Sequence, residues 1–523
     1  MSGQAQRTSV VVGGGLAGLT AALRLAEAGY RVTLVEARPR LGGLAFSFRR
    51  GELTVDNGQH VFLRCCTAYR GLIERLGAGG QVEIQPRLDV PVLAVRGERH
   101  RLGRLRRAAL PVPLHLAASL ASYPHLRPLD RLRVVRGALA LQRLDLADPA
   151  LDQLSFGDWL RSHGQNDRTV AALWDLVGVA TLNAKAEEVS LALAAMVFKT
   201  GLLSDPGASD IGIAAVPLGA VHHDAALAEL TRAEVTVRLR TKVVELRTDR
   251  HMVGGVAAPG LSPERLLLSR QCSAVAPSSA PPRLGPDAAP SSTHHVPVGP
   301  ESVSTTAGPP HAVRLENGEL LSADVVVLAG AQDSAAALLP EGAIAEQHRL
   351  TELGTAPILN VHVVYDRKVL RRPFFAALDS PVQWVFDRTP HSGVSTGRPG
   401  AQYLALSQSA VRDEIDLPVA ELRARYLPEL ERLLPAARNA EVLDFFVTRE
   451  RTATFDPAPG TAVLRPAAAT RIPGLLLAGS WTATGWPATM ESAVRSGHAA
   501  ADAALRAAGE RVPVDRGDGR WPR

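Results

Sequence analysis

Cysteine, aromatic residues and lysine are all scarce in this 523-residue sequence. The three cysteines are Cys65, Cys66 and Cys272, and the adjacent pair is poorly arranged for a mutual disulfide. Their spacing resembles no metal site, so we expect no bound metal, and this usage fits a reducing, cytoplasmic compartment. With aromatic residues at only 4%, the core has to be built from alanine, valine and leucine.

Long apolar runs are also missing. The N-terminal residues lack the apolar stretch of a signal peptide, and no uninterrupted run reaches the ~18 residues that a membrane-spanning helix needs. We therefore expect no spanning helix, while peripheral contact with the inner face of the cell membrane stays open.

Positive charge is carried almost entirely by arginine, and ten arginines fall within residues 96–136, between proline-punctuated apolar segments. Such a stretch is typical of a membrane-docking face or of a solvated basic face, and both interpretations stay open. The formal net charge of +6 concerns association rather than fold, and no pattern indicates a nucleic-acid partner.

The N-terminus has the pattern of a β-α-β unit. A β-branched run at 9–12 stops at three glycines, residues 16–28 follow a helical pattern, and 31–35 form a second strand. Parallel strands joined by a crossover helix predict an α/β sheet. A similar strand, glycine-rich turn and helix close the chain at 474–508, so we expect both chain ends to build one nucleotide-binding sheet.

Gly13, Gly15 and Gly18 have the spacing G-x-G-x-x-G between that first strand and helix. The first glycine allows a tight turn, the second lets the backbone approach a pyrophosphate, and the third allows close helix–strand packing. Leu16 and Ala17 begin the helix, whose N-terminus offers N–H donors and a positive dipole end. This arrangement predicts a dinucleotide site.

Glu36 ends the second strand, 18 residues after the last of these glycines, where a carboxylate accepts both ribose hydroxyls of an adenosine. Ala37 and Arg38 follow, and the paired Gly42 and Gly43 could bring the chain close to a diphosphate or a flavin. This extension resembles the fingerprint of glutathione-reductase-like flavoproteins, and domains that bind only NAD usually lack it. The expected cofactor is therefore FAD.

Residues 477–497 resemble the flavin-contacting end of the amine oxidase and phytoene desaturase superfamily. The resemblance implies that Gly479 and Ser480 meet the diphosphate and ribityl chain, and that N–H groups at Thr489 and Met490 face the pyrimidine end of the flavin. The superfamily usually carries Asp where this chain has Ser480. No cysteine lies near this segment, so we expect FAD to be bound non-covalently.

The sequence DNGQHV at 56–61 is the best candidate on the substrate side. Asp56 either orients the turn by accepting backbone N–H bonds or acts beside the flavin. Gln59 and His60 could reach the substrate or the flavin, and His60 is a candidate proton donor near neutral pH.

Two further positions rest on weaker patterns. Asp210, in ASDIG, is either an acid beside the flavin or a cap for the next turn. The amine oxidase superfamily also implies an adenine contact from the backbone of a strand such as 241–246. Val243 or Val244 would supply that contact here, unless both are plain core valines.

Taken together, DNGQHVFLRCC (56–66), LNA (182–184), the later ASDIG and PLG, and TGWPATMESAVRSG (484–497) resemble the squalene-associated FAD-dependent desaturases. Within them, the hydroxysqualene dehydroxylases of hopanoid biosynthesis are the most similar, over most of the chain except about 250–311. The resemblance implies reductive removal of an allylic hydroxyl from hydroxysqualene, giving squalene. It also implies an isoprenoid substrate in a long apolar tunnel and an electron donor that the sequence does not identify.

The expected fold is a glutathione-reductase-like, Rossmann-type α/β domain for FAD, intertwined with an α+β substrate domain. The FAD domain would take residues 1–90, 225–250, 311–345 and 465–510, and the substrate domain 91–224 and 346–464. Residues 251–310 are crowded with Ala, Pro, Ser and Gly, so we expect a disordered insertion there, and a flexible tail at 511–523.

Two other functions stay open. A carotenoid-type desaturase or an amine oxidase would use the flavin in the oxidative direction. A non-enzymatic binding protein is the other class, since the Rab GDP-dissociation inhibitors use a related fold without redox chemistry. The intact glycine motif and Glu36 argue against that class.

Overall fold

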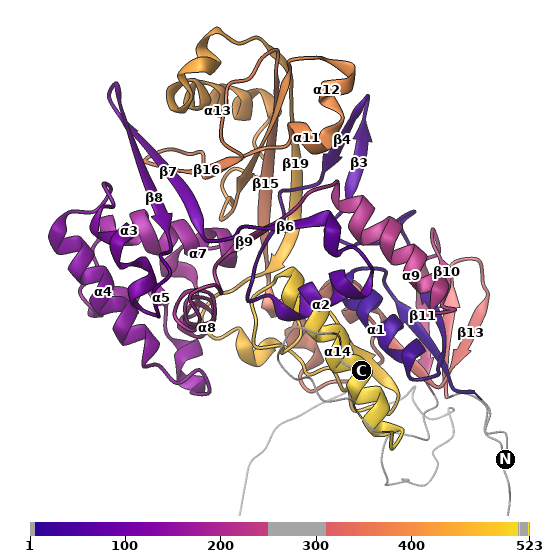
Figure 1. Ribbon diagram of the computed structural model, residues 1–523. Helices are drawn as coiled ribbons and strands as arrows, with labels where there is room; N and C mark the ends of the chain where they lie inside the picture. The colour runs from indigo at the N-terminus through magenta and orange to yellow at the C-terminus, as the bar shows by residue number, and fades with distance from the viewer. Residues whose placement is uncertain (1–5, 249–309, 511, 513–520, 522–523) are drawn as a thin grey trace, which may run out of the picture. The chain divides into compact units, whose positions relative to one another are not determined.

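A five-stranded parallel sheet is built from both ends of the chain and from segments between them (Figure 1). The computed structural model describes residues 6–248, 310–510, 512 and 521. In spatial order the strands are β10 (Thr236–Arg238), β2 (Arg31–Val35), β1 (Thr8–Val12), β14 (Val325–Leu328) and β20 (Leu475–Leu477). All neighbouring pairs are parallel, which confirms the expected sheet.

Two long helices pack on this sheet through apolar side chains. α1 (Leu16–Glu27) and α14 (Met490–Ala507) lie against each other, and their buried residues join those of the sheet in one cluster. A Cβ on Gly497 of α14 would come within 2.3 Å of the Ala17 carbonyl oxygen, so glycine permits this close approach. α2 (Thr67–Arg75) and α9 (Ala226–Arg232) contribute to the same cluster.

A seven-stranded, mostly antiparallel sheet forms the second large element. Its order is β19 (Val442–Phe455), β15 (Thr355–Tyr365), β18 (Gln402–Gln408), β17 (Trp384–Asp387), β16 (Phe374–Leu378), β7 (Asp89–Arg96) and β8 (Arg99–Arg106). One face packs on α13 (Val419–Leu433), whose buried Leu422, Tyr426 and Leu430 follow helical spacing. The opposite face joins an apolar cluster with the helical segment that follows β8.

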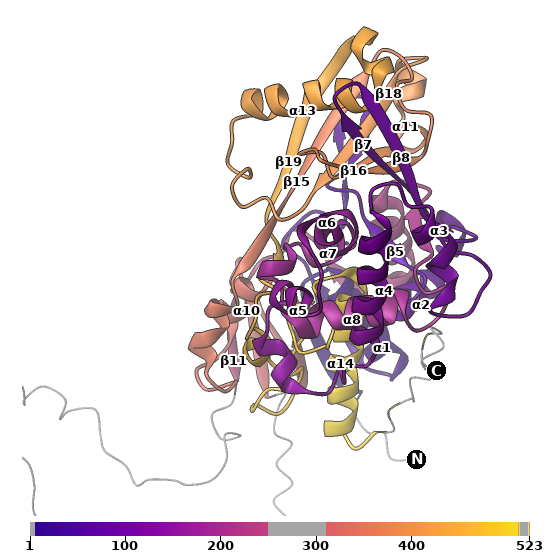
Figure 2. The same ribbon diagram turned by 90° about the vertical axis from the view of Figure 1, so that its left-hand side faces the viewer.

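That helical segment lies beneath β7 and β8 in Figure 2. Its helices are α3 (Ala117–Ala121), α4 (Pro128–Gln142), α5 (Phe156–Ser162), α6 (Asp167–Thr169), α7 (Asp175–Leu182) and α8 (Leu191–Leu202). α5 and α8 start after Ser155 and Ser190, and the Ser155 hydroxyl caps α5 by accepting the Asp158 N–H.

Smaller elements complete the fold. They are the hairpin β3 (Ser47–Arg50) and β4 (Leu53–Asp56), the sheet of β5 (Val61–Leu63), β9 (Ile211–Ala214) and β6 (Val82–Ile84), the sheet of β11 (Val243–Thr248), β12 (His311–Leu315) and β13 (Leu320–Ala323), and helices α10 (Gln332–Leu338), α11 (Thr389–Ser392) and α12 (Val394–Gly397). The turn between β12 and β13 contains Gly318 at a φ of +87°.

The described helices and strands do not test two of the expectations from the sequence. The insertion expected at 251–310 falls outside the described residues except for its last position, and most of the expected tail does too. The division of the chain into an FAD domain and a substrate domain stays a prediction.

Candidate functional site

Gly13 and Gly18 occupy positions that admit no side chain. Gly13 follows β1 with a φ of +114°, and its N–H donates to the Val35 carbonyl oxygen over 2.8 Å. A Cβ on Gly13 would lie 2.7 Å from the carbonyl oxygen of Ala329, and one on Gly18 would lie 1.9 Å from that of Gly13. The turn is therefore as tight as the glycine spacing predicts.

The start of α1 can receive an anion. Its N-cap is Gly15, no side chain caps it, and its first turn holds no acidic residue. The N–H groups of Leu16 and Ala17 have no intrahelical acceptor in such a first turn. A diphosphate would satisfy these donors and the positive end of the helix dipole.

Gly42 and Gly43 pass directly beside this turn, both with positive φ. The Gly42 N–H donates to the Gly14 carbonyl oxygen over 2.9 Å, and a Cβ on Gly43 would lie 2.9 Å from the Gly15 Cα. Arg40 donates to the Gly43 carbonyl oxygen over 2.9 Å. The two glycine segments therefore form one cradle.

Glu36 turns its carboxylate onto the same turn from the end of β2. Oε2 accepts the Gly14 N–H and Oε1 accepts the Arg38 N–H, each over 2.7 Å. Ala37 and Arg38 are exposed beside it. A carboxylate placed next to the pyrophosphate turn fits the ribose of an adenosine.

The chain after β10 runs alongside Glu36. The Thr241 N–H donates to the Glu36 carbonyl oxygen over 2.9 Å, and β11 then starts at Val243. The side chain of Val243 is buried, whereas Val244 is 42% exposed. The strand is thus near the expected adenosine site, and the adenine contact itself stays a prediction.

The segment after β20 contains Gly479 at a φ of +149°, where a Cβ would lie 2.3 Å from Trp481 Nε1. The Gly479 N–H donates to Ser496 Oγ of α14 over 2.8 Å. The Ser480 carbonyl oxygen accepts from Ser492 Oγ over 3.2 Å. The start of α14 therefore holds the backbone of this segment in place.

Thr489 and Met490 mark the beginning of α14. Thr489 is the N-cap, and its Oγ1 accepts the Ser492 N–H over 3.1 Å. β20 is the neighbour of β14, which is the neighbour of β1, so the strand order brings this loop and the glycine turn to the same edge of the sheet. The residues present fit FAD.

Arg465 is a contributor that sequence reasoning missed. It is 7% exposed, and its Nη2 lies within 3.2 Å of the carbonyl oxygens of Ser480, Thr482 and Trp486. Burial lowers the pKa of Arg465 to about 10, which still leaves it charged at neutral pH. One guanidinium thus organises the loop after β20, and no local motif marks it.

Asp56 joins the β3–β4 hairpin to α11. Its Oδ1 accepts from Ser47 Oγ over 2.6 Å and from the Leu218 N–H over 3.0 Å, and its Oδ2 lies 2.9 Å from Arg388 Nη2. Both side chains of the ion pair are almost buried. This geometry favours a role for Asp56 in orienting the backbone. The N–H group that it accepts belongs to Leu218, however, and not to the turn at 56–61.

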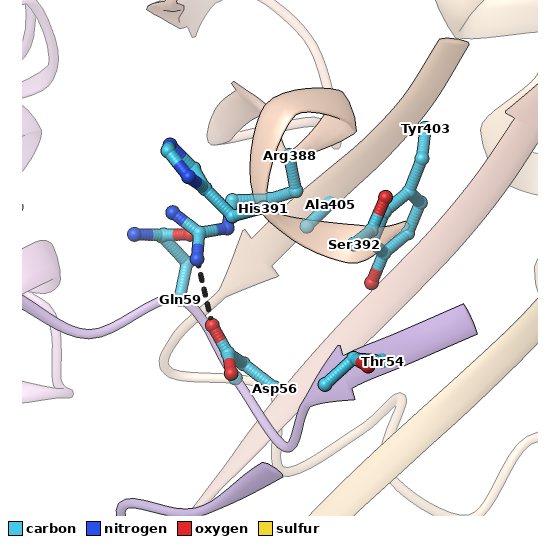
Figure 3. Close-up of a pocket in the computed structure, with 9 residues that line it drawn as sticks. Thr54, Asp56, Gln59, Arg388, His391, Ser392, Tyr403 and Ala405 are labelled. Atoms are coloured by element: carbon cyan, nitrogen blue, oxygen red, sulfur yellow. Dashed lines mark hydrogen bonds and ion pairs between the residues drawn. The ribbon is translucent and has the colours of Figure 1, made fainter. Parts of the chain in front are cut away.

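Asp56, Gly58 and Gln59 line a small cavity of about 10 Å³ together with Arg388 and Tyr403 (Figure 3). Gln59 Oε1 is buried and has no hydrogen-bond partner among the described residues. His60 follows, and its Nδ1 lies 3.0 Å from the Gly58 carbonyl oxygen. Burial lowers the pKa of His60, so its imidazole is neutral at pH 7.

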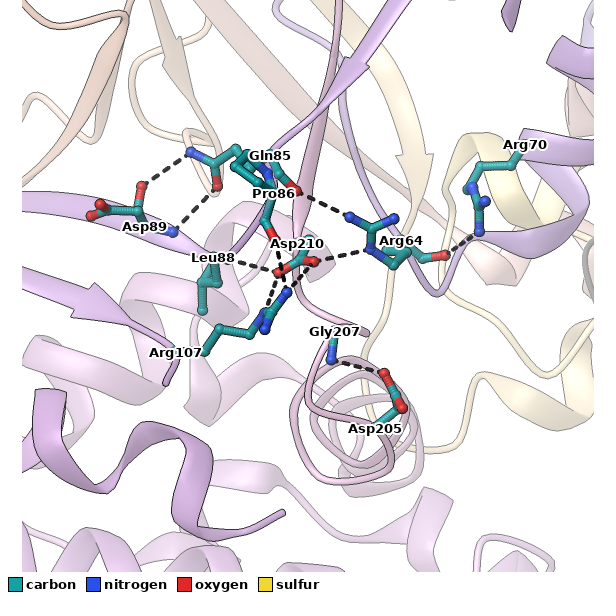
Figure 4. Close-up of polar contacts among 10 residues, drawn as sticks. All are labelled: Arg64, Arg70, Gln85, Pro86, Leu88, Asp89, Arg107, Asp205, Gly207 and Asp210. Carbon is teal, nitrogen blue, oxygen red and sulfur yellow. Dashed lines mark hydrogen bonds and ion pairs between the residues drawn. The ribbon is translucent and has the colours of Figure 1, made fainter. Parts of the chain in front are cut away.

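Asp210 is not among the residues that line this cavity, and its carboxylate lies between Arg64 and Arg107 (Figure 4). It is fully buried, it pairs with Arg107 over 2.6 Å and with Arg64 over 3.0 Å, and it accepts the Leu88 N–H over 2.7 Å. Although burial opposes ionisation, the arginines and this N–H hold the pKa of Asp210 below its usual value. An ionised, fully bonded carboxylate is a poor proton donor, so the arrangement favours a structural role.

Among the described residues, no helix is long and apolar enough to cross a membrane. In the same part of the chain, no group of three or more His, Cys, Asp or Glu side chains could hold a metal ion.

Known proteins resemble this chain over nearly its whole length. The hydroxysqualene dehydroxylase of Rhodopseudomonas palustris is 28% identical, covering 96% of this chain and 99% of that protein. The zeta-carotene desaturase of a Synechocystis strain is 23% identical, covering 95% and 96%. The solved structure of putrescine oxidase bound to putrescine has a TM-score of 0.63 at 17% identity, covering 97% and 99%, which shows a shared fold.

A family model described as flavin containing amine oxidoreductase matches residues 16–261 and 301–505. These ranges contain the helix start at Leu16, Glu36, the paired glycines and the loop after β20, all of which fit the cofactor. The chain therefore belongs to the flavin containing amine oxidoreductase family and is a FAD-dependent oxidoreductase.

Proposed function

We propose that this protein removes the allylic hydroxyl of hydroxysqualene to give squalene, as a step of squalene and hopanoid biosynthesis. The reaction replaces the C–O bond by a C–H bond, consumes a hydride and a proton, and releases water. Reduced FAD is the source of the hydride. The likeness to a protein named hydroxysqualene dehydroxylase over nearly the full chain supports this choice of substrate.

The observation that carries the proposal is one face of the seven-stranded sheet, which is polar at one end and apolar at the other. His362 lies opposite Ala405, Ala405 opposite Phe386, and Phe386 opposite Phe374, so these residues share a row on one face. The neighbouring Trp384 ring stacks on Phe386. A long hydrocarbon with one hydroxyl needs an apolar wall and a few polar groups side by side.

The charges around the cavity favour an alcohol over an amine. Asp56 is paired with Arg388, so its carboxylate is not free to hold an ammonium group. Glu450, whose carboxylate accepts a hydrogen bond from the Asn57 side chain over 2.9 Å, is not among the residues that line the cavity. A neutral hydroxyl needs no counter-ion and is compatible with both arrangements.

His60 is the proposed proton donor. Because a carbonyl oxygen only accepts, Nδ1 must carry the hydrogen that faces Gly58, which leaves Nε2 to take up and release a proton. The buried surroundings that lower the pKa of His60 make its protonated form a stronger acid.

Contact with a membrane surface is part of the proposal, and we assign it to the α4 face. This face consists of Leu129, Leu132, Arg133, Val135, Arg136, Leu139 and Arg143, all exposed and all within one arc of the helix. Leu129 and Leu132 are each 67% exposed, and the only acid of α4, Asp130, is buried. Exposed leucines among arginines fit the interface of an anionic bilayer.

The deciding experiment compares both redox directions. Dithionite-reduced holoenzyme is incubated anaerobically with hydroxysqualene, and oxidised holoenzyme is incubated with phytoene or with amines, followed by mass spectrometry. We expect squalene from the first incubation only. Product formed only by the oxidised enzyme would replace the proposal with a desaturase or an amine oxidase.

A further inference from the structure

Tyr403 ends a chain of hydrogen bonds that starts at the turn after β4. Tyr403 Oη lies 2.7 Å from His362 Nδ1, and His362 Nε2 lies 3.0 Å from Thr448 Oγ1. Thr448 Oγ1 in turn donates to the Asn57 carbonyl oxygen over 2.6 Å. Tyr403 and His362 are 2% and 1% exposed, so water does not compete for the hydrogen bond between them.

The carbonyl oxygen at one end fixes the direction of the whole chain. It can only accept, so the Thr448 hydroxyl must donate to it, and Thr448 Oγ1 is then the acceptor for His362 Nε2–H. Burial lowers the pKa of His362 to about 3, so the ring is neutral and Nδ1 carries no hydrogen. Nδ1 therefore accepts the Tyr403 O–H.

This direction leaves the Tyr403 oxygen with lone pairs only for any further partner. Tyr403 lines the cavity of Figure 3, opposite Gln59, whose Oε1 is a buried acceptor with no donor among the described residues. Asn360 Oδ1 is a second buried acceptor that has no donor among the described residues. The Asn360 side chain is 1% exposed, and its Oδ1 would lie 3.2 Å from a Cβ on Gly58. Buried acceptors without donors are costly, and a ligand that donates a hydrogen bond removes that cost.

We infer that Tyr403 selects the substrate by accepting a hydrogen bond from its hydroxyl, and that the chain through His362 and Thr448 keeps Tyr403 in the accepting direction. This inference rests on the proposed function, because it names the group that holds the leaving hydroxyl. It also separates two roles: Tyr403 orients the hydroxyl, and the proton that leaves with it comes from another residue.

Binding to oxidised holoenzyme tests the inference, because no hydride is available and turnover does not interfere. Dissociation constants are measured from the flavin absorbance for hydroxysqualene, for squalene, and for the analogue in which fluorine, which accepts but does not donate, replaces the hydroxyl. Tyr403→Phe should weaken hydroxysqualene about tenfold. The dissociation constant for squalene should change less than twofold.

Tyr365→Phe is the matched control, since the Tyr365 hydroxyl is buried without a partner among the described residues and its ring packs toward α13.

The fluorinated analogue tests the accepting direction without a mutation, because wild-type enzyme should bind it as weakly as squalene. Equal losses for hydroxysqualene and squalene in Tyr403→Phe, or wild-type binding of the fluorinated analogue as tight as that of the alcohol, would overturn the inference. Turnover by reduced wild-type enzyme decides the proposed function separately. Active enzyme without this discrimination refutes only the role of Tyr403.

Discussion

The α4 face makes a quantitative prediction for membrane binding. Complete burial of a leucine side chain is worth about 1.5–3 kcal/mol. Leu129 and Leu132 are each 67% exposed, so each offers about two-thirds of that value to a bilayer. The double variant Leu129→Gln/Leu132→Gln should therefore lose about 2–4 kcal/mol, a weakening of roughly 30-fold to several hundred-fold.

Co-sedimentation with vesicles measures this loss. Wild-type protein should bind vesicles that contain phosphatidylglycerol better than vesicles of phosphatidylcholine alone, and added salt should weaken this preference because it screens the arginines. The matched control is Leu320→Gln/Val463→Gln, which replaces two exposed apolar side chains outside the α4 face. Leu320 is 50% exposed and Val463 is 70% exposed. If both double variants bind equally well, or if wild-type protein shows no lipid preference, the α4 face is not the docking surface.

Four further predictions concern the cofactor and the chemistry. Glu36→Ala should purify without FAD, whereas Glu98→Ala, an exposed acid in the β7–β8 turn, should keep it; normal flavin absorbance in Glu36→Ala would refute the ribose role. Gly18→Ala should lose FAD or fail to fold, because its Cβ would lie 1.9 Å from the Gly13 carbonyl oxygen, while Gly80→Ala meets nothing within 4 Å and should be neutral in thermal unfolding. Arg465→Lys should weaken FAD binding by about 1–3 kcal/mol, which raises the dissociation constant about 5-fold to 150-fold, because one ammonium group cannot reach all three carbonyl oxygens; an unchanged constant contradicts this. If His60 is the proton donor, kcat/KM should rise steadily as the pH falls from neutral towards its lowered pKa and level off beneath that pKa, because only the protonated imidazole can donate; in His60→Gln this limb of the profile should vanish.

The cofactor segments were predictable from the sequence because they are local. Gly13, Gly15 and Gly18 determine a turn within six residues, and Glu36 follows at the end of the next strand. These conformations depend on which φ angles and Cβ positions the backbone tolerates, so neighbouring residues are enough to indicate them. The parallel sheet from both chain ends follows from the same local patterns.

The substrate side was only partly predictable. DNGQH was the candidate turn, and its Asp56 and Gln59 line a cavity, so its substrate-side role stays a prediction. Arg388 and Tyr403 line the same cavity but come from more than 300 residues away and carry no motif. Asp210 shows the same limit, because its two arginines lie 103 and 146 residues away in the sequence. The sequence left two roles open for Asp210, a cap and an acid beside the flavin, and neither includes this pairing with two arginines.

The sequence by itself therefore predicted a dinucleotide site, because glycines and a carboxylate at this short range are typical of one. Only the tertiary structure decided which polar groups line the cavity beside Gln59, and in which direction their hydrogen bonds run. Strand pairing places His362, Tyr403 and Thr448 within hydrogen-bond reach, and it buries His362 and Tyr403 away from water. A hydrogen-bond direction set by a distant carbonyl group exists only after the chain has folded.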